Sequence, residues 1–232
     1  MKAIPSIRAA KSAPVCAVDI PEHSVKSNWQ SKESAAAYKL SRTPKRFKRY
    51  QLEQSILESW LNDLPAGAIV LDAPCGTGRW IPLLLTHTCR YIGGDFSLAM
   101  IQEAQSGLTD LAAGGFVNLD VERLPFADDS VDCLILWRFL HHVPNQQMRL
   151  NILHEAARVT RNRILLSFHN SLSFTFARKA VERILFRQKL HGQEITHWQL
   201  RREARCCGLE VVGTKSFRKY VSTNWFACLK KL

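Results

Sequence analysis

Residues 70–80, which read VLDAPCGTGRW, combine an acidic side chain with two closely spaced glycines. A short apolar run ends at Asp72, and a turn that contains Gly76 and Gly78 follows before an amphipathic stretch begins. Glycine allows the backbone to approach a ligand closely, and ligands of open parallel sheets bind at the carboxyl ends of the strands. The segment therefore predicts a strand, a ligand-binding turn and the start of a helix.

The residues around this turn narrow the kind of ligand. A dinucleotide fingerprint requires a third glycine for close packing of helix on strand, but Ile81 stands at that position. A phosphate-binding loop requires Gly-Lys-Ser/Thr, which the turn lacks. Because the carboxylate of Asp72 would repel a pyrophosphate and favour a cation or an amino group, we expect a nucleoside ligand without phosphate.

Histidines are the side chains of this chain most suited to acid–base chemistry. His141 and His142 follow a continuous apolar run, and His169 follows a second one. An imidazole has a near-neutral pKa and often serves as a general base; the alternative is a packed or surface position without a chemical role. Cys75, beside the glycine turn, is expected to be a small packing residue and not a nucleophile.

The elements that must position these residues alternate between strand and helix from residue 68 onward, which is typical of an α/β sheet. We expect strands at 68–72, 90–95, 116–120, 131–137 and 163–168, and a closing antiparallel hairpin at 210–215 and 223–230. We expect helices at 79–86, after an N-cap at Ser97, at 145–159, along an insertion at 171–190, and from a capping box at Thr196 and Gln199 to Gly208. Together these predict an α/β fold with a mostly parallel, seven-stranded sheet and helices on both faces.

The N-terminal region has a different character. Residues 1–30 contain scattered prolines and no periodicity, and we expect a flexible basic arm there. A helix is expected at 34–40, and a second helix, with Thr43 as N-cap and Pro44 at its first position, up to residue 64. Basic residues surround Phe47 near the start of this helix. They could hold phosphates and stack on a base, or form a solvated face whose aromatic residue packs inward.

The net charge of +12 is unevenly distributed along the chain. Residues 1–49 carry +8, residues 50–157 carry −8 and residues 158–232 carry +12. Basic ends around an acidic centre suggest an anionic partner, such as RNA, a phosphorylated substrate or a membrane surface, or else they serve solubility. The seven cysteines form no Cys-x-x-Cys pair, so we expect a reduced, cytoplasmic protein without disulfides or a metal site.

The glycine turn resembles motif I of the class I S-adenosylmethionine (SAM)-dependent methyltransferases, in its Asp-x-x-x-Gly-x-Gly form. Asp95 follows Asp72 by 23 positions at the end of the second expected strand, and Asp120 ends the third. Residues 124–132, the two histidines and residues 153–159 extend the likeness to the type 11 and ubiquinone-biosynthesis-like groups. The resemblance covers residues 68–168 at the level of motifs and implies a Rossmann-like methyltransferase domain over residues 31–232.

The resemblance also implies site residues, with SAM as the cofactor and no metal. Asp95 would hold the two ribose hydroxyls, since a carboxylate can accept both, and Asp120 with Val121 would recognise the adenine edge. The cofactor-binding residues that it implies are Asp72, Ala73, Gly76, Gly78, Asp95, Phe96, Met100, Asp120, Val121 and Trp137. His142 and His141 are the expected catalytic residues, as the base for an oxygen or nitrogen acceptor.

The acceptor itself is less constrained. In this family an insertion such as 169–198 usually forms a lid over the acceptor pocket. Residues 136–139, which read LWRF, lack the Asn/Asp-Pro-Pro-Tyr/Phe motif of enzymes that methylate exocyclic amines of bases. We expect a small-molecule acceptor of anionic, lipid-linked or glycan type. The alternatives are an RNA methyltransferase that uses the basic N-terminal region and a catalytically silent SAM-binding protein.

Overall fold

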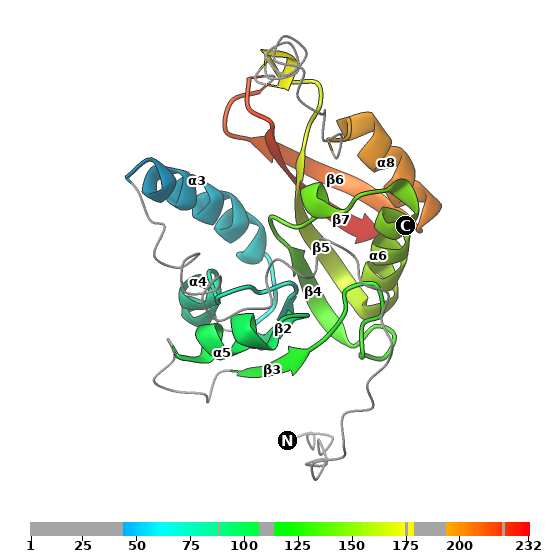
Figure 1. The fold of residues 1–232 in the computed structure, drawn as a ribbon. Helices are drawn as coiled ribbons and strands as arrows, with labels where there is room; N and C mark the ends of the chain where they lie inside the picture. The colour runs from blue at the N-terminus through cyan, green and yellow to red at the C-terminus, as the bar shows by residue number, and fades with distance from the viewer. Residues whose placement is uncertain (1–43, 88, 107–113, 175, 179–193, 220) are drawn as a thin grey trace.

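The computed structural model describes residues 44–232 except 88, 107–113, 175, 179–193 and 220. The expected basic arm at 1–30, the helix at 34–40, the N-cap at Thr43 and most of the helix expected at 171–190 lie outside the described residues. Within the described part, the chain forms one mixed sheet with helices on both sides (Figure 1).

The sheet contains seven strands in the order β3-β2-β1-β4-β5-β7-β6 among the described residues. β1 to β5 pair in parallel, and β7 runs antiparallel to both of its neighbours, which confirms the predicted fold class. The strands are β1 (Ile69–Asp72), β2 (Arg90–Asp95), β3 (Gly114–Asn118), β4 (Val131–Leu136), β5 (Thr160–His169), β6 (Leu209–Ser216) and β7 (Asn224–Lys231).

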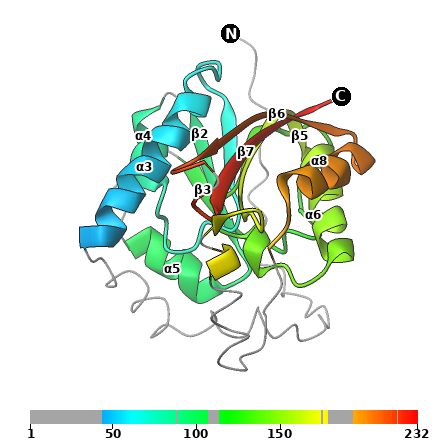
Figure 2. The ribbon, with the colours of Figure 1, turned by 90° about the horizontal axis from the view of Figure 1, so that it is seen from above.

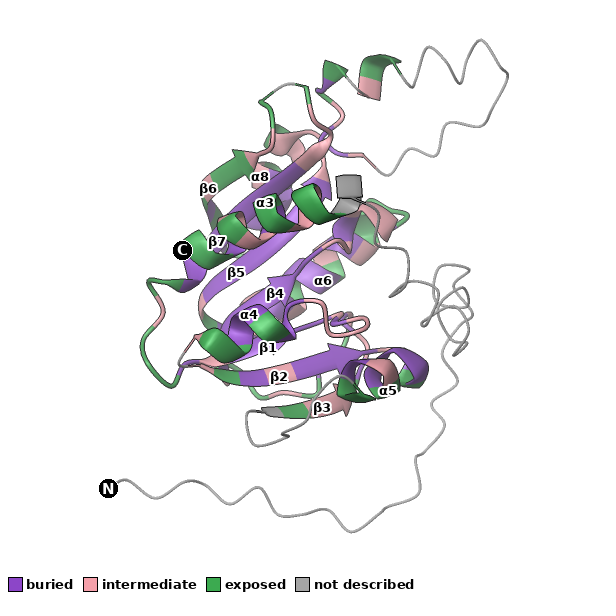
Figure 3. Cartoon of the chain, turned by 90° about the vertical axis from the view of Figure 1, so that its left-hand side faces the viewer, coloured by how far each residue is buried: buried purple, intermediate pink, exposed green. Residues whose placement is uncertain are grey.

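Helices cover the two faces of the sheet in separate groups. On one face lie α3 (Pro44–Leu61), α4 (Ile81–Thr86) and α5 (Leu98–Ser106); on the other lie α6 (Gln146–Val159) and α8 (His197–Cys206) (Figure 2). Two hydrophobic clusters follow from this arrangement, one between the sheet and the α3–α4 side and one between the sheet and the α6–α8 side. The central strands are therefore buried on both faces and read as nearly continuous apolar runs (Figure 3).

The predicted N-caps at Ser97 and Thr196 are formed, and Asn145 caps α6 in the same way. Ser97 Oγ accepts the amide of Met100 (3.3 Å), Asn145 Oδ1 accepts the amide of Met148 (2.9 Å), and Thr196 Oγ1 accepts the amide of Gln199 (3.0 Å). Each cap satisfies one of the amides that the first helical turn leaves without a partner. The capping box at Thr196 is only half present, because the side chain of Gln199 donates to Glu203 Oε1 (3.0 Å).

Several predicted boundaries were wrong. β3 ends at Asn118, two residues before the predicted end, because its partner β2 ends at Asp95 and the two residues pair with each other. β5 begins at Thr160, three residues early, because a bulge opposite Val131 and Cys133 on β4 lets the polar residues 160–163 join the strand. α3 ends at Leu61 and not at residue 64, and α4 begins at Ile81 and not at residue 79.

One of the two interpretations of the basic residues around Phe47 predicted that its ring packs inward, and this prediction is wrong. Its side chain is 56% exposed on the first turns of α3, and Lys48 next to it is exposed as well.

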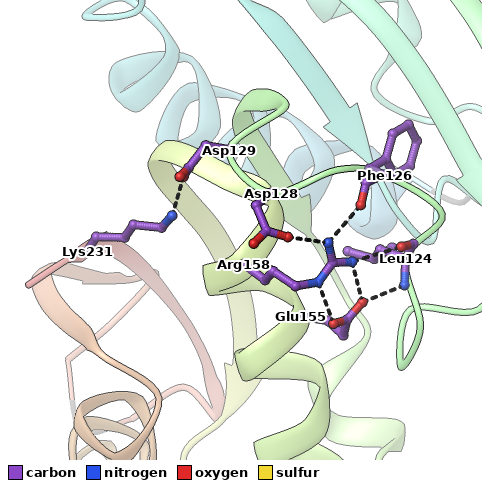
Figure 4. A network of polar contacts seen from close by, with 7 residues as sticks. All are labelled: Leu124, Phe126, Asp128, Asp129, Glu155, Arg158 and Lys231. Carbon is purple, nitrogen blue, oxygen red and sulfur yellow. Dashed lines mark hydrogen bonds and ion pairs between the residues drawn. The ribbon is translucent and has the colours of Figure 1, made fainter.

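An arginine on α6 fixes the segment that leads from β3 into β4 (Figure 4). Arg158 donates to the carbonyl oxygens of Leu124 (2.9 Å) and Phe126 (2.8 Å), and it pairs with Glu155 (2.8 Å) and Asp128 (2.9 Å). Glu155 in turn accepts the amide of Leu124 (2.8 Å). The segment at 124–128 is therefore fastened to the far side of the sheet from α3, which aligns β4 and the residues that follow it.

Candidate active site

A cavity of about 380 Å³ lies at the carboxyl ends of β1, β2 and β4. This volume is within the range of small-molecule sites, and the position is the one at which open parallel sheets bind their ligands. Its lining comes from the glycine turn, the start of α5 and the segment after β4, and consists of Pro74, Cys75, Gly76, Thr77, Arg79, Trp80, Asp95, Phe96, Ser97, Met100, Trp137, Arg138, Phe139, His141 and His142.

The structure separates the predicted site residues into two groups. Seven of them line the cavity together: Gly76, Asp95, Phe96, Met100, Trp137, His141 and His142. Five others do not line it: Asp72, Ala73, Gly78, Asp120 and Val121. Contact with a cofactor stays a prediction for all twelve residues, and the position of the first seven is the one compatible with it.

The two glycines of the turn have different tasks. Gly76 has a φ of +55°, and a Cβ added there would meet no atom within 4 Å, so its backbone faces open space. Gly78 has a φ of +73°, and a Cβ there would lie 2.5 Å from Ile81 Cδ1 and 3.1 Å from Ala104 Cβ. Gly76 thus leaves room in the cavity, whereas Gly78 lets the turn pack against α4 and α5 behind it.

Asp95 joins the glycine turn to the start of α5. Its Oδ2 accepts the amide of Gly76 (2.8 Å) and its Oδ1 accepts the amide of Ser97 (2.9 Å). Burial raises the pKa of this carboxyl group, and the backbone hydrogen bonds oppose that shift. Each carboxylate oxygen can accept a second hydrogen bond, so the group can still receive two hydroxyls from a ligand. The chemistry of this donor set fits a ribose.

The apolar wall beside Asp95 comes from Phe96 and Met100. Asn118, which the sequence did not single out, holds this loop in place: its Nδ2 donates to the carbonyl oxygens of Asp95 (2.9 Å) and Phe96 (2.8 Å). Asp120 Oδ1 accepts the amide of Glu122 (3.1 Å) within its own turn.

Asp72 is completely buried at the end of β1. Burial, followed by the charge of Asp95, raises its pKa well above the usual value, and the nearby Tyr91 hydroxyl offsets this only in part. Although this hydroxyl is near, neither carboxylate oxygen accepts a hydrogen bond of normal geometry from the residues that the structure describes. A buried carboxyl group of this kind is stabilised by protonation or by a cation nearby. Burial also raises the pKa of the Cys75 thiol, which keeps it protonated.

A row of stacked rings forms another wall of the cavity. Trp137 stacks on Phe226 of β7 with 4.8 Å between ring centroids, and it meets Trp80 edge to face at 5.7 Å. Trp80 in turn stacks on Tyr50 of α3 at 5.4 Å. The indole nitrogen of Trp137 is buried and has no hydrogen-bond partner among the described residues, so it is available to a ligand.

The histidines come together on a single turn of 3-10 helix, η2 (Leu140–His142). The ring of His141 lies 4.1 Å from that of His142 and 4.0 Å from that of His169, measured between centroids. Burial lowers the pKa of His141 to about 2, and it also lowers the pKa of His142. Both rings that line the cavity are therefore neutral near pH 7.

Two charged residues that sequence reasoning missed support the cavity. Arg79 lines it and pairs with the buried Glu53 of α3 (3.3 Å), with its guanidinium 5.0 Å and 5.1 Å from the ring centroids of Tyr50 and Trp80. Glu53 also pairs with Arg49 (3.0 Å). Arg79 stands directly after the glycine turn and could have been found there, but Glu53 lies in a helix with no signal for a site.

Among the described residues, no group of three or more His, Cys, Asp or Glu side chains is placed to hold a metal ion. In the same part of the chain, no helix is long and apolar enough to cross a membrane. Six of the cysteines are described, and all of them are free thiols.

Comparisons with known proteins agree with this geometry. Residues 70–163 match a family model described as a methyltransferase domain. The tRNA (carboxymethyluridine(34)-5-O)-methyltransferase of Arabidopsis thaliana is 28% identical over 67% of this chain and 35% of its own length. The demethylmenaquinone methyltransferase of Bacillus licheniformis is 32% identical over 44% of each chain. The chain thus spans less than half the length of these two curated relatives.

The same fold occurs in a solved structure, the magnesium protoporphyrin IX methyltransferase of Synechocystis PCC 6803 with bound S-adenosylhomocysteine. The TM-score is 0.71 at 19% identity, and the match covers 90% of this chain and 98% of the other. The glycine turn and Asp95 both lie within the residues that match the family model. Residues 70–163 therefore form a methyltransferase domain, and the fold of the chain is that of the class I SAM-dependent methyltransferases.

Proposed function

We propose that this protein transfers the methyl group of SAM to a small, anionic acceptor. The observation that carries the proposal is the carboxylate of Asp95, held by the amides of Gly76 and Ser97 at the edge of a 380 Å³ cavity. This donor set suits a ribose diol, and no phosphate-binding loop accompanies it. When bound, SAM supplies an electrophilic methyl group on a sulfonium.

The residues of the chain have separate tasks in this reaction. Asp95 accepts the ribose hydroxyls, while Phe96 and Met100 pack against the nucleoside. Trp80 and Trp137 form an apolar wall that excludes water from the site of transfer. Methyl transfer depends mainly on alignment of the two partners in a dry site, and this arrangement provides both.

His142 and His141 lie on the acceptor side of the cavity in this proposal. Because their pKa values are lowered, each neutral ring offers one N–H donor and one acceptor nitrogen near pH 7. They can thus orient an acceptor, or receive a proton from one that carries it. The amide of Ile195 donates to the carbonyl oxygen of His169 (3.0 Å), which fastens the C-terminal end of the predicted insertion at 169–198 beside β5. Residues 179–193, on which the predicted lid depends, lie outside the described residues.

A direct experiment incubates the full chain with methyl-labelled SAM and a cell extract, which is then separated into RNA, protein, lipid and small-solute fractions. We expect label in the small-solute or lipid fraction. Binding of S-adenosylhomocysteine in a calorimeter without transfer of label to any fraction would instead indicate a silent SAM-binding protein and refute the proposal.

RNA is a second candidate acceptor, because the exposed Phe47 and Lys48 on α3 could stack on a base and pair with a phosphate. The double variant Phe47→Ala/Lys48→Gln tests this candidate. If RNA is the acceptor, the chain binds RNA in a salt-dependent manner and the variant binds it more weakly. Label in the RNA fraction that this variant loses would favour RNA over a small molecule.

A further inference from the structure

Arg138 occupies a strained backbone position directly after β4. Its φ is +56°, in the left-handed region that non-glycine residues rarely adopt. The hydroxyl of Ser167 on the neighbouring strand β5 accepts its amide (2.6 Å) and holds it there. Arg138 lines the cavity beside Phe139 and the two histidines. The fold thus maintains an unfavourable conformation that places an arginine in the cavity.

The charge of Arg138 is not compensated within the described part of the chain. Its side chain makes no ion pair or hydrogen bond with any residue that the structure describes, whereas Arg49 and Arg79 share the buried carboxylate of Glu53. The carboxylate among the described lining residues is that of Asp95, which the amides of Gly76 and Ser97 already hold. A cation beside apolar walls is therefore open to an anionic group of a ligand.

The imidazoles next to Arg138 are poor bases. The charge of Arg138 contributes to lowering the pKa of both His141 and His142, and all three residues line the same cavity. His169 on β5 and Arg49 on α3 act on His141 in the same direction. The surroundings of the histidines are thus cationic and desolvated, and they disfavour a step in which an imidazole gains a proton.

We propose that the acceptor atom is an oxygen of a carboxylate that Arg138 holds, and that the product is a methyl ester. The inference rests on the proposed function and identifies its acceptor. A lone pair of the carboxylate oxygen forms the new bond to the methyl carbon, and the carbon–sulfur bond breaks with its electron pair going to sulfur. The anionic oxygen and the sulfonium both become neutral, so no proton has to be removed.

This reaction matches the groups that are present. A guanidinium holds a carboxylate through two parallel hydrogen bonds, which also fixes the direction of the reacting oxygen. The neutral His142 can donate one further hydrogen bond. The rings of Trp80, Trp137 and Phe139 form apolar surface for the body of the acceptor. A small organic acid with a flat, apolar body fits this combination.

The carboxylate of the cofactor itself is the competing partner for Arg138. Arg79 is better placed for that group, because it follows the glycine turn by one residue and lines the same cavity. Its ion pair with Glu53 does not prevent this, since one guanidinium has five N–H donors and can bind more than one acceptor. Replacement of Arg138 should therefore leave the affinity for S-adenosylhomocysteine unchanged.

The first test uses the labelled fractions described above. Methyl esters release their methyl group as volatile methanol in mild alkali, whereas methyl groups on nitrogen, carbon or ether oxygen remain bound. We expect alkali-labile label on a free organic acid in the solute fraction or on an acid extracted with the lipids. Alkali-stable label, or label on RNA, would overturn the inference while the methyltransferase function stands. Absence of label from every fraction would refute both.

The second test does not require the natural acceptor. Phenylacetate and its neutral analogue phenylacetamide are titrated into the protein saturated with S-adenosylhomocysteine, with fluorescence of the cavity tryptophans as the readout. The wild-type protein should bind the acid about tenfold more tightly than the amide, as expected for one charge-assisted hydrogen bond. Equal binding of the two probes would contradict the inference.

Variants then assign the preference to one residue. Arg138→Gln should abolish the preference for the acid, and Arg138→Lys should keep part of it. Arg205→Gln, on the exposed face of α8, is the matched control and should bind both probes as the wild type does. A preference that survives in Arg138→Gln, or a weaker affinity of that variant for S-adenosylhomocysteine, would show that Arg138 does not hold the acceptor.

Discussion

The substitution Asp95→Asn tests the cofactor site most sharply, because the shape of the side chain is retained and one oxygen is replaced by an NH2 group. In the wild type, both carboxylate oxygens accept backbone amides, Oδ1 from Ser97 (2.9 Å) and Oδ2 from Gly76 (2.8 Å). In either orientation of the amide, the NH2 group of asparagine faces one of these N–H donors. One anchor of the cofactor loop is therefore lost.

Two measurable changes follow from this loss. The free energy of unfolding should fall by about 1–3 kcal/mol, the cost of an unsatisfied donor in a buried site. The affinity for S-adenosylhomocysteine should fall by more, because the charge that receives the ribose hydroxyls is also gone. Loss of one charge-assisted hydrogen bond, about 1.5–3 kcal/mol, corresponds to a Kd that is roughly 10- to 150-fold weaker.

Calorimetric titration with S-adenosylhomocysteine and urea unfolding of the free protein separate the two changes. Glu210→Gln, an exposed carboxylate on β6, is the control and should alter neither quantity. If Asp95→Asn is less stable but binds with the wild-type Kd, then Asp95 only tethers the loop and the proposed ribose contact is wrong.

Three further predictions test other parts of the structure. Burial raises the pKa of Asp72 in the folded state, so the wild type loses stability as pH rises from the usual carboxyl pKa of about 4 toward that raised value; the stability of Asp72→Asn relative to wild type should therefore increase between about pH 4 and neutral pH, as measured by urea unfolding. A relative stability that does not change with pH would mean that Asp72 does not titrate in this range. Arg158→Gln should lower the free energy of unfolding by about 1–2 kcal/mol at neutral pH, since its partners are partly exposed. Because Arg158 lowers the pKa of Glu155, this deficit should shrink as pH falls below about 4; an equal deficit at all pH values would assign it to packing. Gly78→Ala should be more destabilising than Gly76→Ala in thermal unfolding, because both have a positive φ but only Gly78 meets neighbouring atoms; equal melting temperatures would contradict this.

Much of the fold was predictable because its signals are local. The apolar runs that become β1, β4 and β5 lie between the two helical layers, and burial on both faces leaves no alternation to obscure them. The N-caps at Ser97 and Thr196 depend on residues three positions apart, and both were predicted correctly. The end of β3 was not predictable in this way, because it is set by the end of β2 and not by its own residues.

In the candidate site, too, residues with local sequence signals could be predicted, whereas residues that act through distant contacts could not. Gly76 and Asp95 could be recognised from residue type and spacing at the ends of two strands, and the structure brings them into direct contact. Asn118 and Glu53 could not be recognised, because each acts on residues far away in the sequence. Phe47 was open to two interpretations, and only the placement of α3 decided that its ring is exposed.

The sequence by itself determined the kind of cofactor turn and its acidic partner, since both depend on short spacings and on the chemistry of individual residues. Tertiary structure decided which side chains surround the cavity beyond this turn. Insertion of β7 between β5 and β6 brings Phe226 against Trp137, and the left-handed turn after β4 places Arg138 beside the histidines. Burial then sets the pKa of His141 and His142. Long-range packing and desolvation leave no local pattern in a sequence, so the acceptor side of the site became visible only in the folded chain.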